Sequence, residues 1–179
     1  MLLHPWHDIE IGSDAPVSCN AFIEISRGSR AKYEIDKTSG LLKLDRVLYS
    51  SVYYPVNYGF LPQTLQLDGD PLDVLVISQV DIAPHCMATV RVIGVMRMID
   101  QGVTDDKIIA VALKDTSVAH IKEVEDLAPH IEKEFCHFFE TYTLLEGKKV
   151  TTKKFEHRQE AYKIINESIS LYKDKFKNP

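Results

Sequence analysis

The chain of 179 residues is 45% hydrophobic and 26% charged, which predicts one folded domain with a sizeable core and excludes a disordered protein. Its formal net charge of −5 argues against a general nucleic-acid-binding surface, and it has no apolar run of about 18 residues to cross a membrane. Its three cysteines form no CxxC pair, and its first residues lack a signal-peptide pattern. We therefore expect a reduced, cytoplasmic protein in which Cys19 and Cys86 are small buried residues.

The first 113 residues predict a strand-rich body preceded by an irregular arm. Residues 1–17 are rich in Pro, Asp and Gly and predict an arm lying on the body, with His4 and His7 as surface groups. Residues 50–62 predict an aromatic loop. Alternating or continuous apolar runs predict six strands, at residues 20–25, 32–35, 41–48, 74–77, 88–96 and 108–113. Strands at this spacing indicate a small barrel or sandwich.

The tail changes to a helical pattern. Pro129 can open a helix in which apolar residues recur at three- and four-residue steps, and Gly147 is expected to end it. A second amphipathic helix is predicted over residues 162–172. We interpret the aromatic stripe of the first helix as core packing against the barrel: Phe135, Phe138 and Phe139. The expected architecture is a single domain of residues 1–179, with an arm (1–17), a barrel (about 18–115) and a helical part (about 116–179).

An acidic turn precedes the strand predicted at residues 74–77. Asp68, Asp70 and Asp73 lie within six residues, with Gly69 and Pro71 between them. Three carboxylates this close repel one another and call for a divalent cation or nearby Lys and Arg. The spacing excludes an EF-hand loop, which needs Gly at position six and Glu at position twelve. A solvated surface turn and a metal site both fit this stretch.

Other polar residues interrupt the predicted strands or occupy their ends and turns. The acids are Glu24, Glu34, Asp68, Asp70, Asp73, Asp100 and Asp105; the cations are Lys32, Arg46 and Lys107; the phenols are Tyr54, Tyr58 and Tyr142. Acids with interleaved cations suit Mg²⁺ bound together with a polyphosphate, whose remaining charge Lys and Arg would cover. Each residue alone is typical of a surface or strand edge, and composition does not establish that they converge.

The order and spacing of these motifs resemble the family I soluble inorganic pyrophosphatases of the bacterial type, over residues 20 to 160. The D-x-D-P-x-D-V run is far more specific to that family than a lone turn motif. The motifs are Ile23-Glu24-Ile25, Lys32-Tyr33-Glu34-Ile35-Asp36-Lys37, Asp45-Arg46, Tyr54-Pro55-Val56-Asn57-Tyr58-Gly59, Asp68-Gly69-Asp70-Pro71-Leu72-Asp73-Val74, Asp105-Asp106-Lys107 and His137-Phe138-Phe139-Glu140-Thr141-Tyr142.

The resemblance implies a role for each matching position. Asp70 matches the general base that activates the attacking water. Tyr58 matches a phenol beside the metal and base carboxylates. The positions that match metal ligands or acids at the metal cluster are Asp68, Asp73, Asp100, Asp105, Glu34 and Glu24. The positions that match phosphate-holding groups are Lys32, Arg46, Lys107 and Tyr142.

The resemblance also implies a fold and an activity. The expected fold is mainly β with α (α+β), a small twisted OB-like β-barrel with two flanking C-terminal helices, and bacterial members are usually homohexamers. The expected reaction is the hydrolysis of pyrophosphate to two orthophosphates in the cytoplasm, which pulls biosynthetic reactions forward. Several Mg²⁺ ions per site are expected, with Mn²⁺ or Zn²⁺ as substitutes, and neither nucleic acid nor membrane as a partner.

Two departures from the family pattern bear on this expectation. The family commonly has Lys directly after the last tyrosine, where this chain has Thr143, so one phosphate-binding cation is missing unless Lys148 or Lys149 replaces it. Gln101 follows Asp100 where the family usually has an acid. Two other functions stay open: an OB-like nucleic-acid-binding module, which the net negative charge disfavours, and a weakened homologue acting in metal binding or assembly.

Overall fold

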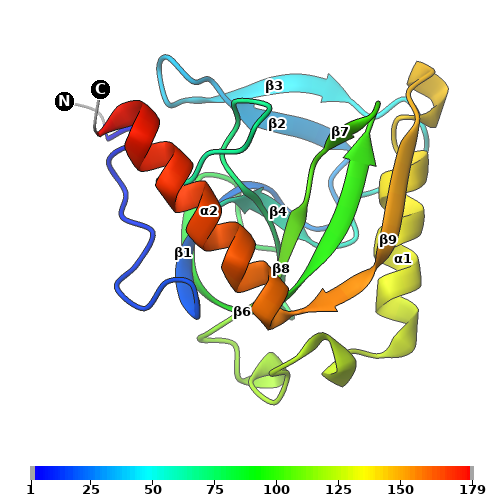
Figure 1. The fold of residues 1–179 in the computed structure, drawn as a ribbon. Helices are drawn as coiled ribbons and strands as arrows, with labels where there is room; N and C mark the ends of the chain where they lie inside the picture. The colour runs from blue at the N-terminus through cyan, green and yellow to red at the C-terminus, as the bar shows by residue number, and fades with distance from the viewer. Residues whose placement is uncertain (1–2, 178–179) are drawn as a thin grey trace.

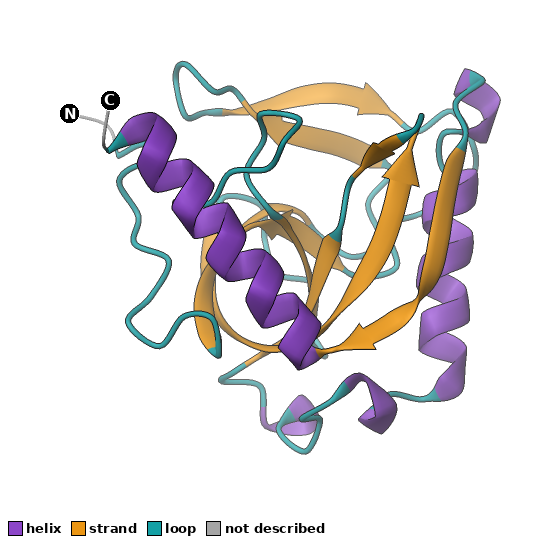
Figure 2. Cartoon of the chain, viewed as in Figure 1, coloured by secondary structure: helices purple, strands orange, loops and turns teal. Residues whose placement is uncertain are grey.

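The computed structural model describes residues 3–177, which fold as a ring of strands flanked by two helices (Figures 1 and 2). The strands are β1 (Ser18–Ile25), β2 (Ala31–Ile35), β3 (Leu42–Val47), β4 (Asn57–Phe60), β5 (Asp73–Ile77), β6 (Cys86–Asp100), β7 (Val103–Thr104), β8 (Lys107–Ala112) and β9 (Val150–His157). The helices are α1 (Pro129–Thr141) and α2 (Arg158–Phe176), and short 3-10 turns occupy Thr116–Val118, Val124–Asp126 and Leu144–Glu146.

The main sheet closes on itself. β1 pairs antiparallel with both β4 and β6, so the order β1-β4-β5-β8-β6 returns to its start. Only the β5–β8 contact in this ring is parallel. β7 and β9 extend the sheet from β6, and β2 and β3 form a separate antiparallel hairpin above the ring (Figure 1). This closed ring with two later helices is the expected OB-like α+β fold.

The 15-residue strand β6 makes closure possible because it bends. Its register with β8 shifts between Val92 and Gly94, and its register with β9 shifts between Met96 and Met98. Such irregularities increase the local twist of a strand and redirect its pairing. One end of β6 therefore pairs with β1 and the other with β7 and β9.

Both faces of β5 are covered. Val74 and Val76 pack in a cluster that includes Ile165 of α2, whereas Leu75 packs in the cluster that contains the aromatic stripe of α1. Successive side chains of a strand point to opposite faces, so a strand covered on both sides carries a continuous apolar run. Val74, Leu75 and Val76 are accordingly fully buried, and the predicted core role of the Phe stripe is confirmed.

The six predicted strands are all present, but three strands and one helix end were not predicted. β4 lies inside the segment expected to be an aromatic loop. Its Gly59, a residue typical of loops, instead lets β4 approach β1 closely. β7 has two residues, and β9 is largely polar. α1 ends at Thr141 rather than Gly147, which instead closes the following 3-10 turn with a left-handed φ of +73°.

Two predictions of side-chain exposure are wrong. Cys86, the first residue of β6, is exposed although its backbone pairs with Ile23 of β1, while Cys19 is buried as expected. His4 and His7 are half-buried, and their rings lie with centroids 4.5 Å apart and planes tilted by 39°. No helix within residues 3–177 combines the length and apolar character that spanning a membrane requires.

Candidate active site

A cavity of about 300 Å³ opens at the edge of the ring, between β5, β8, the hairpin β2–β3 and the end of α1. It collects every predicted site residue except Arg46. Its lining residues are Glu24, Lys32, Glu34, Ile35, Lys37, Tyr54, Tyr58, Asp68, Asp70, Pro71, Asp73, Asp100, Asp105, Lys107, Phe139 and Tyr142. Positions from residue 24 to residue 142 thus share one space, which the sequence pattern suggested without proving.

The parallel pairing of β5 and β8 builds the centre of this cavity. Asp73 and Lys107 are the first residues of the two strands and face each other in register. The Lys107 ammonium, 3% exposed, pairs with both Asp73 and Asp105. Burial alone would lower the pKa of Lys107, but the two carboxylates outweigh it and raise that pKa, so Lys107 stays charged. Burial raises the pKa of Asp73 to about 6, against the opposing effect of Lys107.

The acidic turn is held by its own backbone. The Gln66 N–H donates to the Asp70 carbonyl at 2.8 Å, and the Asp70 N–H donates to the Asp68 carboxylate at 2.9 Å. Gly69 adopts a φ of +89°, which favours glycine. Burial raises the pKa of Asp68. The Asp70 side chain is half exposed and pairs with Lys37.

The hairpin contributes a second group of charges. Lys32 and Glu34 are two residues apart on β2, so their side chains point to the same face, where they form an ion pair. Arg46 lies opposite Lys32 in the hairpin register, but its guanidinium pairs with Asp45 and donates to Glu146 at 2.8 Å. Arg46 is therefore a neighbour of Lys32 that is held by Asp45 and Glu146, and it is not among the residues that line the cavity.

Glu24 and two tyrosines are further buried polar groups of the cavity. Glu24 is 5% exposed and accepts a 2.7 Å hydrogen bond from the Ile35 N–H, which ties β1 to β2. Burial, and then Asp73, raise the pKa of Glu24 to about 8. Burial also raises the pKa values of Tyr58 and Tyr142, so both phenols stay protonated and can donate.

The donor set fits hard divalent cations. Seven carboxylates and three ammonium groups line the cavity, so carboxylate charge exceeds cationic charge. The Oδ1 atom of Asp100 is buried and has no hydrogen-bond partner among the described residues. Carboxylate oxygens in excess are the ligands that Mg²⁺ and similar ions take. The acidic cluster could therefore hold a metal.

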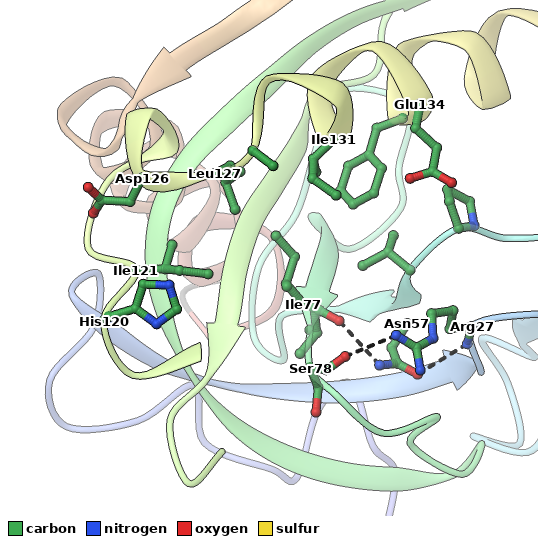
Figure 3. A pocket seen from close by; sticks show the side chains of 15 residues that line it. Arg27, Asn57, Ile77, Ser78, His120, Ile121, Asp126, Leu127, Ile131 and Glu134 are labelled. Carbon is green, nitrogen blue, oxygen red and sulfur yellow. Dashed lines mark hydrogen bonds between the residues drawn. The ribbon is translucent and has the colours of Figure 1, made fainter. Parts of the chain in front are cut away.

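Two other features are weaker candidates for the site. A larger apolar cavity of about 470 Å³ lies between β5 and the start of α1, but Arg27, Asn57 and Ser78 on its wall already bond one another or the backbone (Figure 3). Glu123, Glu125 and His157 place possible ligand atoms within 4.8 Å of one another, yet Glu123 is paired with Arg158 and Glu125 with His157.

The structure adds Lys37 and locates Thr143. Lys37 was not among the predicted site residues because a lysine in a hairpin turn is usually a solvated group, and only folding brings it to Asp70. Thr143 is fully buried, and its hydroxyl has no partner among the described residues. Lys148 lies 3.7 Å from Glu146, and neither it nor Lys149 is among the lining residues. Neither Lys148 nor Lys149 therefore replaces the missing cation directly.

The closed β-ring and its acid-lined cavity, in which ammonium groups lie among carboxylates, define a class of proteins whose site could hold a metal. The model of the inorganic pyrophosphatase family matches residues 21–173. The chain belongs to this family, as a soluble family I member, and it is an enzyme.

Relatives and solved structures agree with this assignment. The chain is 52% identical to soluble inorganic pyrophosphatase 3 of Arabidopsis thaliana, covering 94% of this chain and 78% of that protein. It is 51% identical to a soluble inorganic pyrophosphatase of Oryza sativa subsp. indica, with 94% and 79% covered. The inorganic pyrophosphatase of Thermus thermophilus superposes with a TM-score of 0.92 at 38% identity, covering 96% of this chain and 99% of that one.

Proposed function

We propose that this enzyme hydrolyses inorganic pyrophosphate to two orthophosphates with Mg²⁺ in the cytoplasm. The observation that carries the proposal is the excess of carboxylates around the buried Lys107 in the cavity. The three cysteines, all free, support a reducing compartment. The acidic lining disfavours the nucleic-acid-binding alternative, because such surfaces need a cationic groove.

The residues divide into cation-holding and anion-holding groups. Asp68, Asp73 and Asp105 would hold the first Mg²⁺, and Asp100, Glu34 and Glu24 would complete the sites for further ions, with Mn²⁺ or Zn²⁺ as substitutes. Bound divalent cations supply a water of lowered pKa and neutralise phosphate charge. Lys32, Lys107 and Tyr142 would hold the phosphates. Arg46, next to Lys32 but outside the lining, would support Lys32.

The chemical step needs one proton acceptor. Water attacks one phosphorus atom, a new P–O bond forms, and the bond from that phosphorus to the bridging oxygen breaks. Asp70, half exposed at the cavity edge, takes the proton of the attacking water. Lys32 and Lys107 stabilise charge on the departing phosphate. Tyr58 donates from a protonated phenol beside Asp73 and keeps that carboxylate ionised.

Phosphate release tests this proposal. Purified protein should release orthophosphate from pyrophosphate with Mg²⁺, and excess chelator should abolish release until Mg²⁺ is restored. Nucleoside triphosphate is the matched control substrate and should release far less phosphate. Folded protein that releases none with Mg²⁺, Mn²⁺ or Zn²⁺ would leave the weakened-homologue reading, with Thr143 as the first position to revert to Lys.

A further inference from the structure

The N-terminal arm contacts both chain segments that meet at the proposed base. We propose that His4 is a positioning residue of the hydrolytic site, which holds the Lys37 backbone so that the Lys37 ammonium orients Asp70. The inference rests on the proposed function of the cavity. It uses the HxxH segment, which the predicted site left unassigned.

His4 contacts the hairpin turn through its ring. Its Nε2 lies 3.1 Å from the Lys37 carbonyl, and its Nδ1 lies 3.3 Å from the Trp6 N–H. Because the Trp6 N–H can only donate, Nδ1 accepts, and the neutral ring carries its proton on Nε2. Nε2–H therefore donates to the Lys37 carbonyl.

The turn is shaped to receive this ring. Gly40 has a φ of +72°, and a Cβ placed there would lie 3.0 Å from the His4 ring and from Pro5. The Gly40 N–H donates to the Asp36 carbonyl at 2.8 Å, and the Asp36 N–H donates to the Leu41 carbonyl at 2.8 Å. These contacts close the turn on which Lys37 stands.

The arm is anchored on the other side to the segment that carries the acidic turn. The buried Trp6 indole donates to the Thr64 carbonyl at 2.7 Å, and the Gln63 N–H donates to the Trp6 carbonyl at 2.9 Å. The Thr64 hydroxyl accepts the Leu72 N–H at 2.9 Å. The arm thus contacts both the hairpin turn that carries Lys37 and the loop that leads to the acidic turn. These two loops are not joined directly by the chain, so contacts such as these fix their relative position.

Lys37 is the point where the two loops touch. Its ammonium pairs with Asp70 and lies 3.3 Å from the Gly69 carbonyl. Both side chains of the pair are about half exposed, and exposed ion pairs alone hold little fixed geometry. Holding the Lys37 backbone in place supplies this constraint, because it limits the positions that the Lys37 ammonium can reach.

A set of variants separates the hydrogen bond from the packing of the ring. His4→Gln keeps an N–H donor without the ring, whereas His4→Phe keeps a ring without the donor. We expect His4→Gln to retain the wild-type turnover number, and His4→Phe and His4→Ala to lower it about five-fold. The control His130→Ala removes an exposed histidine at the start of α1 and should leave turnover unchanged. The reverse ranking, with Phe active and Gln impaired, would overturn the proposal.

A double-mutant cycle tests whether His4 acts through Lys37. Lys37→Met should lower turnover, and His4→Phe should add less than two-fold in the Lys37→Met background, because the contact it serves is already gone. Multiplying effects would show that His4 acts independently and would refute the positioning role.

A second readout does not depend on activity. In chelator-treated protein, hydrogen exchange at the amides of Asp36 and Gly40 should quicken about ten-fold or more in His4→Phe but not in His4→Gln. Unchanged exchange in His4→Phe overturns the tether whatever the activity. If His4→Phe shows the faster exchange but the wild-type protein releases no phosphate, the tether stands and the proposed function is contradicted.

Discussion

At the scale of single residues, Asp70 and Thr143 separate the chemistry from the packing. Asp70 pairs with Lys37 of the hairpin turn, and its half-exposed side chain can meet both water and substrate. Thr143 occupies the position where the family commonly has Lys, but it is buried and its hydroxyl finds no partner within residues 3–177. The first residue concerns rate, and the second concerns stability.

Asp70→Asn should lower turnover by about 100-fold or more, because an amide cannot accept the proton of the attacking water. Metal affinity should stay within a few-fold of wild type, since the matched ligands Asp68, Asp73 and Asp105 are intact. Steady-state rates and titration calorimetry with Mg²⁺ measure the two quantities. Asp81→Asn, which removes an exposed acid paired with Arg27, is the control. Near-normal turnover in Asp70→Asn would exclude the base role.

Thr143→Val should raise the free energy of unfolding by about 1 kcal/mol, because it removes a buried hydroxyl without a partner. Urea unfolding gives the value, and Thr151→Val, at an exposed position of β9, should change it by less than about 0.5 kcal/mol. A loss of stability at position 143 would show that the hydroxyl has a hydrogen-bond partner, such as a buried water.

At the scale of elements, the close approach of β4 to β1 and the docking of the arm on α2 are the critical contacts. β4 lies between β1 and β5 and carries Tyr58 into the cavity. The arm reaches α2 through His7, whose Nδ1 lies 2.7 Å from the Tyr172 hydroxyl. The first contact places Tyr58 in the cavity, and the second holds the arm against α2.

Gly59→Ala should destabilise the protein by about 3 kcal/mol or more, since its Cβ would lie 1.9 Å from the Phe22 carbonyl oxygen. The backbone of β1 cannot yield without breaking the ring. Gly147→Ala is the matched control, because its Cβ meets nothing within 4 Å and it pays only for a φ of +73°, about 1 kcal/mol. Equal losses in the two variants would contradict the close-approach argument.

Stability should fall as the pH drops below about 6.5, in part through His7. Burial, then the neighbouring His4, lower the pKa of His7 below its ordinary value of 6.5. The unfolded chain then binds the proton more readily, so the contribution of His7 is present above pH 6.5 and is lost below it. Urea unfolding at pH 7.5 and 5.5 should show a smaller difference for His7→Gln than for wild type. An identical difference would exclude His7 as a contributor.

At the scale of the whole molecule, we propose that the protein assembles as the homohexamer that the family resemblance implies. Several large apolar side chains are exposed on the isolated chain, including Val80, Met87, Leu144 and Leu145. Six copies of the 20.4 kDa chain give a mass of about 122 kDa, which sedimentation should show. A species of 20.4 kDa at micromolar concentration would contradict this prediction.

Local sequence determined most of the elements and the identity of the chemistry. A continuous apolar run marks β5 because both of its faces are covered, and the Phe stripe marks the buried face of α1. The run from Asp68 to Asp73 carries its own turn residues, Gly69 and Pro71, so its geometry is largely local. The family resemblance then assigned the reaction class.

Tertiary structure alone decided which charges meet. Asp73 and Lys107, 34 residues apart, become neighbours through a parallel register that no local pattern encodes. Arg46 turns to Glu146, 100 residues away, and Lys37 of the hairpin turn pairs with Asp70 of the acidic turn. β4 is a strand in spite of its glycine because neighbours on both sides pair with its backbone. Such contacts join distant segments, and their energies exist only once the chain has folded.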